Sequence, residues 1–88
     1  EKRRVFVDQT EVHLTPIEYK LLLLLIANRG KVLTHHYIMQ KVWGYESSDT
    51  KVVRVFMASL RRKIEKQPDN PHLILTEVGV GYRFADMA

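Results

Sequence analysis

Cysteine is absent from this 88-residue sequence, which excludes disulfides and thiolate metal sites as a means of holding the fold together. No secretory signal pattern is visible. The apolar run from Leu21 to Ile26, between Lys20 and Arg29, is far shorter than the roughly 20 residues that span a bilayer. We therefore expect a cytoplasmic protein that does not associate with membranes.

Features of enzymes are equally scarce. None of the three serines has an obvious base and orienting group, and no pair of carboxylates stands in an apolar setting. Gly79-Val80-Gly81 precedes a strand pattern and lacks the third glycine of a nucleotide-binding loop. The adjacent His35 and His36 would point about 100° apart on a helix, so they do not form a metal site. The sequence predicts no enzymatic activity, no metal and no cofactor.

Basic residues outnumber acidic ones. The chain carries 14 lysines and arginines against 10 aspartates and glutamates, which gives a net charge of +4 and an isoelectric point near 9.6. In so small a domain this balance favours a polyanionic partner such as nucleic acid. A soluble surface that is basic for no functional reason would have the same net charge, and charge alone does not distinguish these two interpretations.

Local patterns divide the chain into short strands and three helices. In chain order, the predicted elements are strands at residues 4–7 and 10–14, helices at about 16–28, 35–42 and 50–66, and strands at 73–78 and 82–84. Thr15, Pro16 and Glu18 predict a capping box at the start of the first helix, and Thr34 caps the second. An extended bridge at 31–33 joins these two helices. The last two helices, followed by a hairpin, predict an α+β winged helix-turn-helix.

The N-terminal hairpin turns at Asp8-Gln9 and is too small to be stable alone. We expect further strands to complete its sheet, either from upstream of this sequence or from the C-terminal hairpin. The sequence begins close to a strand pattern without an initiator methionine. We therefore expect a fragment of a longer protein, with an N-terminal antiparallel sheet that is partly truncated.

The first two helices have recognisable core faces. On the first, the residues expected to be buried are Ile17, Leu21, Leu24 and Leu25, with Leu22, Leu23 and Ile26 widening the buried face. On the second, the residues expected to face inward are Tyr37, Ile38 and Val42. A first helix this apolar is expected to lie at the centre of its domain.

The third helix has two contrasting faces. At about 100° per residue, the apolar positions that lie together and predict a stripe packed on the core are Val53, Met57, Leu60 and Ile64. The opposite side carries Lys51, Val55, Ala58 and Arg62, flanked by Arg54 and Ser59. Cations suit a surface to phosphate, and small side chains let a helix backbone approach closely, as a helix in the major groove of DNA requires. A solvated charged face is the alternative interpretation.

Five short patterns occur in order along the chain: Leu14-Thr15-Pro16-Ile17-Glu18-Tyr19 before the leucine run, residues 28–34, Val42-Trp43-Gly44, residues 60–64 and residues 76–84. Together they resemble the C-terminal effector domain of OmpR/PhoB-type response regulators over nearly the whole chain. The resemblance implies that residues 1–88 are a winged-helix DNA-binding domain, with three helices, an N-terminal antiparallel sheet and a C-terminal β-hairpin wing at about 73–84. It also implies an upstream receiver domain through which a sensor kinase acts.

The same resemblance implies particular partners. Members of the family bind direct repeats in promoters as tandem dimers, so double-stranded DNA with direct repeats and a second copy of the chain are expected. Contact with RNA polymerase is implied for the loop after the second helix, here Tyr45, Glu46, Ser47 and Ser48. The long apolar first helix and the closing segment 79–84 look most similar to the family's regulators of potassium transport, which implies control of such genes.

The resemblance makes the third helix a recognition helix, at about 50–66. The residues expected to contact bases are Lys51, Arg54, Val55, Ser59 and Arg62, with Val55 placed for a thymine methyl group and Ser59 reading through water. The residues expected to contact phosphates are Thr34, His35, Trp43, Ala58, Arg61, Thr76 and Tyr82. A helix-capping role alone accounts for the threonine at position 34 equally well, and packing in the core accounts for the tryptophan at position 43. Arg61 has the alternative of pairing with an acid such as Glu18.

Val78 stands at the wing position where some family members place an arginine in the minor groove, and valine cannot take that electrostatic part.

A winged-helix module that binds another protein is the alternative function. A protein-docking face more often shows an aromatic anchor. Phe56 is the candidate anchor on the third helix, although core packing explains it more simply. The cations Lys51, Arg54 and Arg62 favour DNA.

Overall fold

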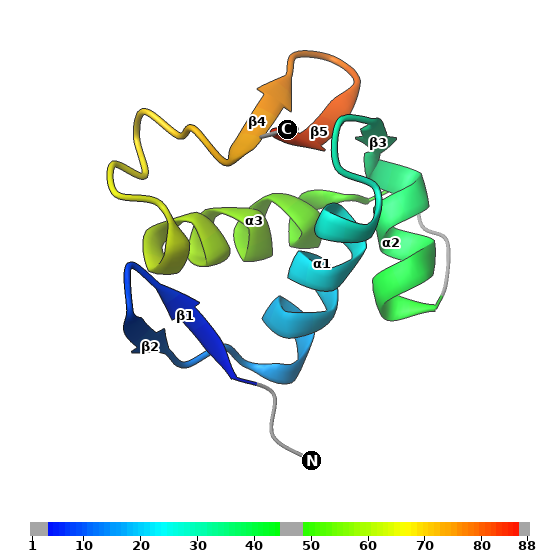
Figure 1. Ribbon diagram of the computed structural model, residues 1–88. Coiled ribbons are helices and arrows are strands. Elements are labelled where there is room, and N and C mark those ends of the chain that lie inside the picture. Colours follow the sequence, from blue (N-terminus) through cyan, green and yellow to red (C-terminus); the bar gives the residue numbers. More distant parts are fainter. Residues whose placement is uncertain (1–3, 45–48, 87–88) are drawn as a thin grey trace.

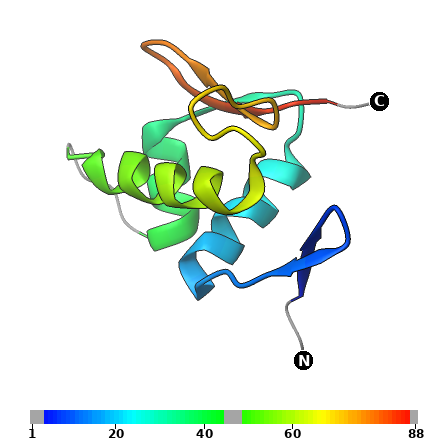
Figure 2. The same cartoon turned by 90° about the vertical axis from the view of Figure 1, so that its left-hand side faces the viewer.

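The computed structural model describes residues 4–44 and 49–86, which form three helices and five short strands (Figure 1). The elements are β1 (Val5–Val7), β2 (Thr10–Val12), α1 (Pro16–Ala27), β3 (Val32–Thr34), α2 (His35–Trp43), α3 (Lys51–Ile64), β4 (Ile74–Glu77) and β5 (Gly81–Phe84). Helix α3 packs against α1 and α2, and the β4–β5 hairpin lies alongside as a wing (Figures 1 and 2). The predicted α+β winged helix-turn-helix is confirmed.

The start of α1 follows directly from its sequence. Thr15 is extended, and its Oγ1 accepts a hydrogen bond from the Glu18 N–H at 3.2 Å, while the Glu18 carboxylate accepts one from the Thr15 N–H at 2.9 Å. This reciprocal pair satisfies two N–H groups that the start of a helix leaves open. Pro16 stands in the first turn, where no N–H is needed. The predicted capping box is confirmed.

The core lies where the three helices and β4 meet. Its most deeply buried side chains, each at most 1% exposed, are Leu21, Leu25, Ile38, Met39, Val53, Met57, Leu60 and Ile74. The predicted core stripe of α3 is therefore confirmed. Burial is wrongly predicted for Leu23, Ile26 and Tyr37, which are 49%, 37% and 37% exposed. Side chains of α1 that point away from α2 and α3 stay open to solvent despite their hydrophobicity.

The wing belongs to a three-stranded antiparallel sheet in the order β3-β5-β4. The segment predicted as an extended bridge is thus the strand β3, with Leu33 opposite Tyr82. A Cβ atom on Gly81 would lie 1.9 Å from the carbonyl oxygen of Leu33, so only glycine lets the two strands approach this closely. Gly79, with φ of +77°, makes the turn between β4 and β5.

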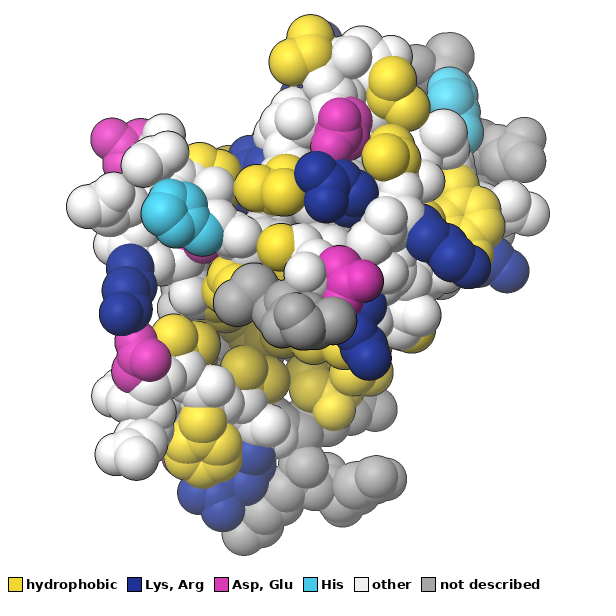
Figure 3. Space-filling model, turned by 45° about the horizontal axis from the view of Figure 1, so that its top comes forward, with side chains coloured by type: hydrophobic (Ala, Val, Ile, Leu, Met, Phe, Trp, Pro, Cys, Tyr) yellow, Lys and Arg dark blue, Asp and Glu magenta, His cyan; other side chains and the backbone are white. Residues whose placement is uncertain are grey.

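The β1–β2 hairpin lies at the opposite end of the molecule from the wing (Figure 1). Asp8 and Gln9 turn with φ angles of 50° and 67°, both positive as in the common two-residue hairpin loop. Among the described residues these strands pair only with each other, so the C-terminal hairpin does not complete their sheet. Figure 3 shows hydrophobic side chains in the hollow between this hairpin and the rest of the molecule, which Val7, Ile64 and Leu73 help to line.

Helix α3 is slightly shorter than predicted. Thr50 precedes it without a side-chain capping bond, and the Asp49 Oδ1 accepts the hydrogen bond of the Lys51 N–H at 3.1 Å instead. The helix ends at Ile64 rather than near residue 66, because the backbone of Glu65 is extended, with φ −88° and ψ 141°.

Candidate nucleic-acid interface

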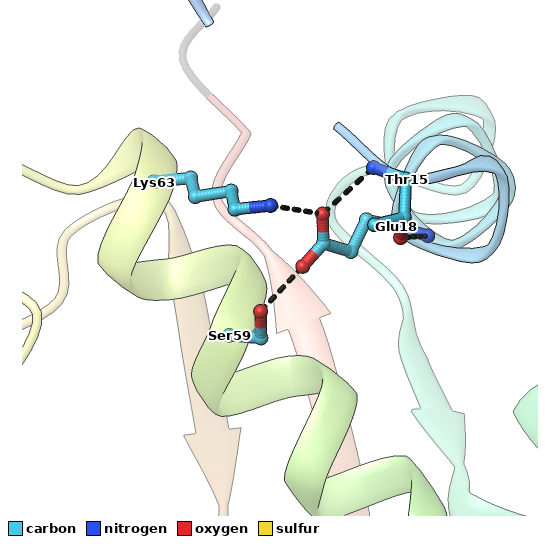
Figure 4. Close-up of polar contacts among 4 residues, drawn as sticks. All are labelled: Thr15, Glu18, Ser59 and Lys63. Atoms are coloured by element: carbon cyan, nitrogen blue, oxygen red, sulfur yellow. Dashed lines mark hydrogen bonds and ion pairs between the residues drawn. The ribbon is translucent and has the colours of Figure 1, made fainter. Parts of the chain in front are cut away.

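A buried carboxylate fixes α3 against α1 (Figure 4). Glu18 is 2% exposed; its Oε1 accepts a hydrogen bond from Lys63 Nζ at 2.7 Å, and its Oε2 accepts one from the Ser59 hydroxyl. Burial alone would raise the pKa of Glu18, but the bonds from Lys63, Ser59 and the Thr15 N–H outweigh it and lower the pKa to about 2. The ionised carboxylate therefore holds two side chains one turn apart on α3 and helps to set which face of that helix looks outward.

The contacts of Glu18 bear on two predictions about this part of α3. The Ser59 hydroxyl is directed at Glu18 and the side chain is half-buried, so the predicted reading of a base through water stays a prediction. Arg61 does not pair with Glu18, because Lys63 takes that place. A helical wheel gives the angle of Ser59 on α3, but it does not reveal that a carboxylate from α1 reaches over that flank.

The outward face of α3 carries the remaining residues predicted to contact bases. These are Lys51, Arg54, Val55 and Arg62, all exposed, with Val55 63% exposed. Ala58 is also exposed and lies between Val55 and Arg62 on the same side of the helix. Its small side chain leaves the backbone close to the surface, and the flanking cations suit that surface to phosphate. The arrangement predicted for this face is present, and contact with DNA stays a prediction.

The start of α2 lies beside the wing. Thr34 is exposed, and its Oγ1 caps the helix by accepting the hydrogen bond of the Tyr37 N–H at 3.1 Å. The His35 ring meets the Tyr82 ring edge-on, with centroids 5.3 Å apart. Burial, and then the positive charge of Arg54, lower the pKa of His35. Both effects favour the uncharged imidazole in the free domain.

Trp43 packs at the C-terminal end of α2. Its ring meets the ring of Phe56 in a T-shaped contact, with centroids 5.4 Å apart, and both side chains are half-buried against the core. Phe56 thus has a partner within the domain and is not a free anchor for another protein. The phosphate contact predicted for Trp43 stays a prediction. The predicted polymerase loop, Tyr45, Glu46, Ser47 and Ser48, lies outside the described residues.

Three residues predicted to contact phosphates meet where α3 approaches the wing. Arg61 donates a hydrogen bond to the Thr76 Oγ1 at 2.7 Å, and its guanidinium carbon lies 5.4 Å from the centroid of the Tyr82 ring. Thr76 remains exposed, whereas Tyr82 is only 5% exposed. Arg61 and Tyr82 therefore make contacts within the domain before any contact with DNA.

The tip of the wing is apolar. Val78 is 90% exposed and Val80 is 50% exposed. Arg83, on β5, donates a hydrogen bond to the Glu77 carboxylate at 2.9 Å, so its charge is offset within the wing. The tip therefore presents apolar surface, in keeping with the expectation that Val78 takes no electrostatic part.

Sequence reasoning missed the structural roles of two acids. The capping pattern marks Glu18 as part of a helix start, and its bonds to α3 follow only once α1 and α3 are in contact. Glu65, the residue that follows α3, is 9% exposed. The available signal was its position four residues after Arg61, but that spacing indicates an ion pair rather than a bond to another segment.

Residues 4–44 and 49–86 contain neither a candidate metal site nor a candidate membrane span. Within these ranges, no group of three histidine, aspartate or glutamate residues could hold a metal ion. None of the helices in the described part of the chain has both the length and the hydrophobicity to cross a bilayer. The exposed cations of α3 are the feature with the clearest chemical preference.

Comparisons with known proteins agree with this geometry. The family described as "Transcriptional regulatory protein, C terminal" matches residues 9–84. The KDP operon transcriptional regulatory protein KdpE of Escherichia coli (strain K12) is 46% identical over 83 residues, which cover 93% of this chain and 37% of that protein. The chain thus spans well under half the length of this curated relative.

Two solved structures are similar in fold. Response regulator DrrB, a Thermotoga maritima OmpR/PhoB homolog, gives a TM-score of 0.86 at 34% identity, covering 94% of this chain and 38% of that one. The DNA-binding domain of response regulator AdeR, solved in complex with an intercistronic region, gives a TM-score of 0.79 at 26% identity. That match covers 96% of this chain and 85% of the AdeR chain.

Proposed function

This chain belongs to the family of C-terminal domains of OmpR/PhoB-type transcriptional regulatory proteins, and we propose that it binds promoter DNA in a sequence-specific manner. Helix α3 lies in the major groove, and the β4–β5 wing lies near the minor groove or the phosphate backbone. The similarity to AdeR, whose DNA-binding domain was solved with DNA, supports this proposal. No catalytic step is involved, because binding alone is the output of such a domain.

The observation that carries the proposal is the contrast between the two faces of α3. Val53, Met57 and Leu60 are fully buried, while Lys51 and Arg62 are exposed on the opposite side. A helix with side chains is about 10–12 Å wide and the major groove is about 12 Å wide, so a narrow outward face is required. Ala58 keeps this face narrow, and the two cations can donate hydrogen bonds to base edges in the groove.

Specificity and affinity come from different residues in this proposal. Lys51, Arg54 and Arg62 donate to base edges, with arginine able to bond guanine in a bidentate manner, and Val55 contacts a thymine methyl group. Phosphate contacts that position the domain come from Thr34, His35, Trp43, Ala58 and Thr76. The proposal gives Arg61, Ser59 and Tyr82 no direct DNA contact, because their polar or aromatic groups are engaged inside the domain.

The proposal extends to the protein of which residues 1–88 are the output domain. It includes an upstream receiver domain on which a sensor kinase acts. Two observations support this: the chain covers only 37% of the length of KdpE, and DrrB is described as a response regulator. The 46% identity with a KDP operon regulator supports potassium-transport genes as targets. Tandem dimers on direct repeats, contact with RNA polymerase through residues 45–48 and a cytoplasmic location complete the proposal.

Selection of bound sites from random DNA, with the intact protein, tests the proposed function. We expect a defined motif whose two half-sites lie about one helical turn apart. The selected site should bind at least about 10³-fold more tightly than scrambled DNA, and affinity for both should fall linearly on logarithmic axes as salt increases. Equal affinity for selected and scrambled DNA at every salt concentration would reject the proposal.

A further inference from the structure

The wing is attached to α3 at the first residue of β4. Ile74 is fully buried, and Arg61 Nη2 on α3 donates a hydrogen bond to its carbonyl oxygen at 2.8 Å. The Ile74 N–H in turn donates to the Glu65 Oε2 at 2.7 Å. Because β4 is an edge strand, its outward backbone groups have no neighbouring strand to bond. Arg61 on α3 and Glu65, the residue after this helix, thus satisfy both backbone groups of Ile74, which would be costly to bury unpaired.

Glu65 accepts hydrogen bonds from more than one backbone N–H group at the start of the wing. Its carboxylate also accepts hydrogen bonds from the N–H groups of His72 and Leu73, each at 3.0 Å. Three consecutive backbone donors thus converge on one side chain that is 9% exposed. The carboxylate fixes the place where the chain, after the loop that follows α3, enters the wing.

Arg61 extends the attachment across both strands of the wing. Its guanidinium also bonds the Thr76 Oγ1 at 2.7 Å on β4, and it lies 5.4 Å from the ring of Tyr82 on β5. Thr76 and Tyr82 are opposite each other in the strand register. The Tyr82 ring then meets His35 at the start of α2. A chain of contacts therefore runs from α3 through the wing to the other helix of the helix-turn-helix.

We propose that Arg61 and Glu65 are positioning residues that hold the wing at a fixed place relative to α3. We call these two residues the clamp. The consequence for DNA rests on the proposed function: α3 and the wing meet the duplex as one preformed surface, so neither has to be ordered during binding. Arg61 contributes to specificity through the wing and does not act as a phosphate ligand.

Amide hydrogen exchange of the intact protein, without DNA, tests the clamp directly. Arg61→Lys keeps the charge but loses the forked donor geometry, so exchange at residues 74–84 should speed up about tenfold or more relative to α1. Arg62→Lys, at the adjacent exposed position, is the matched control and should leave exchange unchanged. Thr76→Val removes only one bond of the clamp, so it should raise amide exchange at the wing less than Arg61→Lys does. If Arg61→Lys fails to fold, Thr76→Val serves as the test of the clamp.

Two outcomes of the exchange experiment would overturn the clamp. If Arg61→Lys exchanges its wing amides at the wild-type rate, these bonds do not hold the wing in place. If Arg61→Lys does not fold, a wild-type rate in Thr76→Val leads to the same conclusion. An equal rise over α1 and the wing would show a general loss of stability rather than a positioning role.

DNA binding provides a second readout that separates the clamp from the proposed function. The ratio of affinities for the selected site over scrambled DNA should fall about tenfold in Arg61→Lys, with the salt slope unchanged, because no phosphate contact is lost. A phosphate ligand would tolerate this charge-conserving change, so a wild-type ratio contradicts the clamp. If the wild type itself shows no preference for the selected site, the proposed function fails and hydrogen exchange still decides the clamp.

Discussion

Lys63 Nζ lies 2.7 Å from Glu18 Oε1, across the contact between α3 and α1. The side chain of the acid is 3% exposed, whereas that of the lysine is 35% exposed. The same carboxylate accepts the hydrogen bond of the Thr15 N–H that caps α1. One buried charge thus joins the start of the first helix to the helix proposed to read DNA, so its loss should be measurable in the stability of the whole domain.

Replacing Glu18 with glutamine keeps the shape of the side chain and removes its charge. We expect the free energy of unfolding to fall by about 1–3 kcal/mol, since breaking a buried ion pair costs about 3–5 kcal/mol and Lys63 remains partly solvated. Urea unfolding followed by circular dichroism measures the loss. Glu11→Gln is the control, because Glu11 is exposed and paired with Arg4, and it should change stability little. Equal losses in the two variants would argue against a structural role for the buried bonds.

Acid should weaken the fold through the same group. The pKa of Glu18 is lowered from 4.5 to about 2 in the folded state, so the unfolded state takes up the proton first. The contribution of the ionised carboxylate is complete above about pH 5 and is lost as the pH falls toward about 2. Between about pH 6 and about pH 3, the wild type should lose more free energy of unfolding than Glu18→Gln. Parallel pH profiles of unfolding for the two proteins would contradict this assignment.

Removing cations from the outward face of α3 should weaken binding to DNA. Lys51→Ala and Arg62→Ala should each cost about 1–3 kcal/mol on the selected site if they bond bases, and relax specificity at one position. If either contacts phosphate instead, affinity for all sequences should fall alike and the salt slope should flatten by about one unit. Lys66→Ala is the control, because Lys66 is exposed beside Asp8 of the N-terminal hairpin. Fluorescence anisotropy at several salt concentrations distinguishes these results, and variants indistinguishable from wild type would exclude this face from the interface.

Val55 should contribute an apolar contact to one thymine. Its side chain is 63% exposed in the free domain, so Val55→Ala should leave the free energy of unfolding nearly unchanged. On the selected site, the variant should lose about 1 kcal/mol, in proportion to the methyl groups removed from a contact that excludes water. Replacing each thymine by uracil in turn deletes the matching methyl group. One such replacement should weaken the wild type but not Val55→Ala; if every replacement affects both proteins equally, Val55 makes no such contact.

Local signals in the sequence were sufficient for the parts of the fold that depend on neighbours along the chain. The capping box of Thr15 and Glu18, the positive-φ turn at Asp8-Gln9 and the core stripe of α3 all arise from residues a few positions apart. Contacts between distant segments were not accessible in the same way. Strand β3 is three residues long and forms only because Leu33 meets Tyr82, far along the chain.

The candidate site shows the same division. Helical periodicity correctly placed Lys51, Val55 and Arg62 on the side of α3 away from the core. It did not reveal the hydrogen bond of Ser59, because that bond depends on a carboxylate supplied by α1. The attachment of Arg61 to the wing depends equally on the position of β4, which no pattern within α3 contains.

A crystal structure of the intact protein bound to its selected site tests the central claim most directly. The account predicts that α3 enters the major groove with Lys51, Val55 and Arg62 at base edges or phosphates, while Val53 and Met57 stay in the core. A complex in which that side of α3 faces solvent, or is covered by another protein chain while different elements hold the DNA, would contradict it.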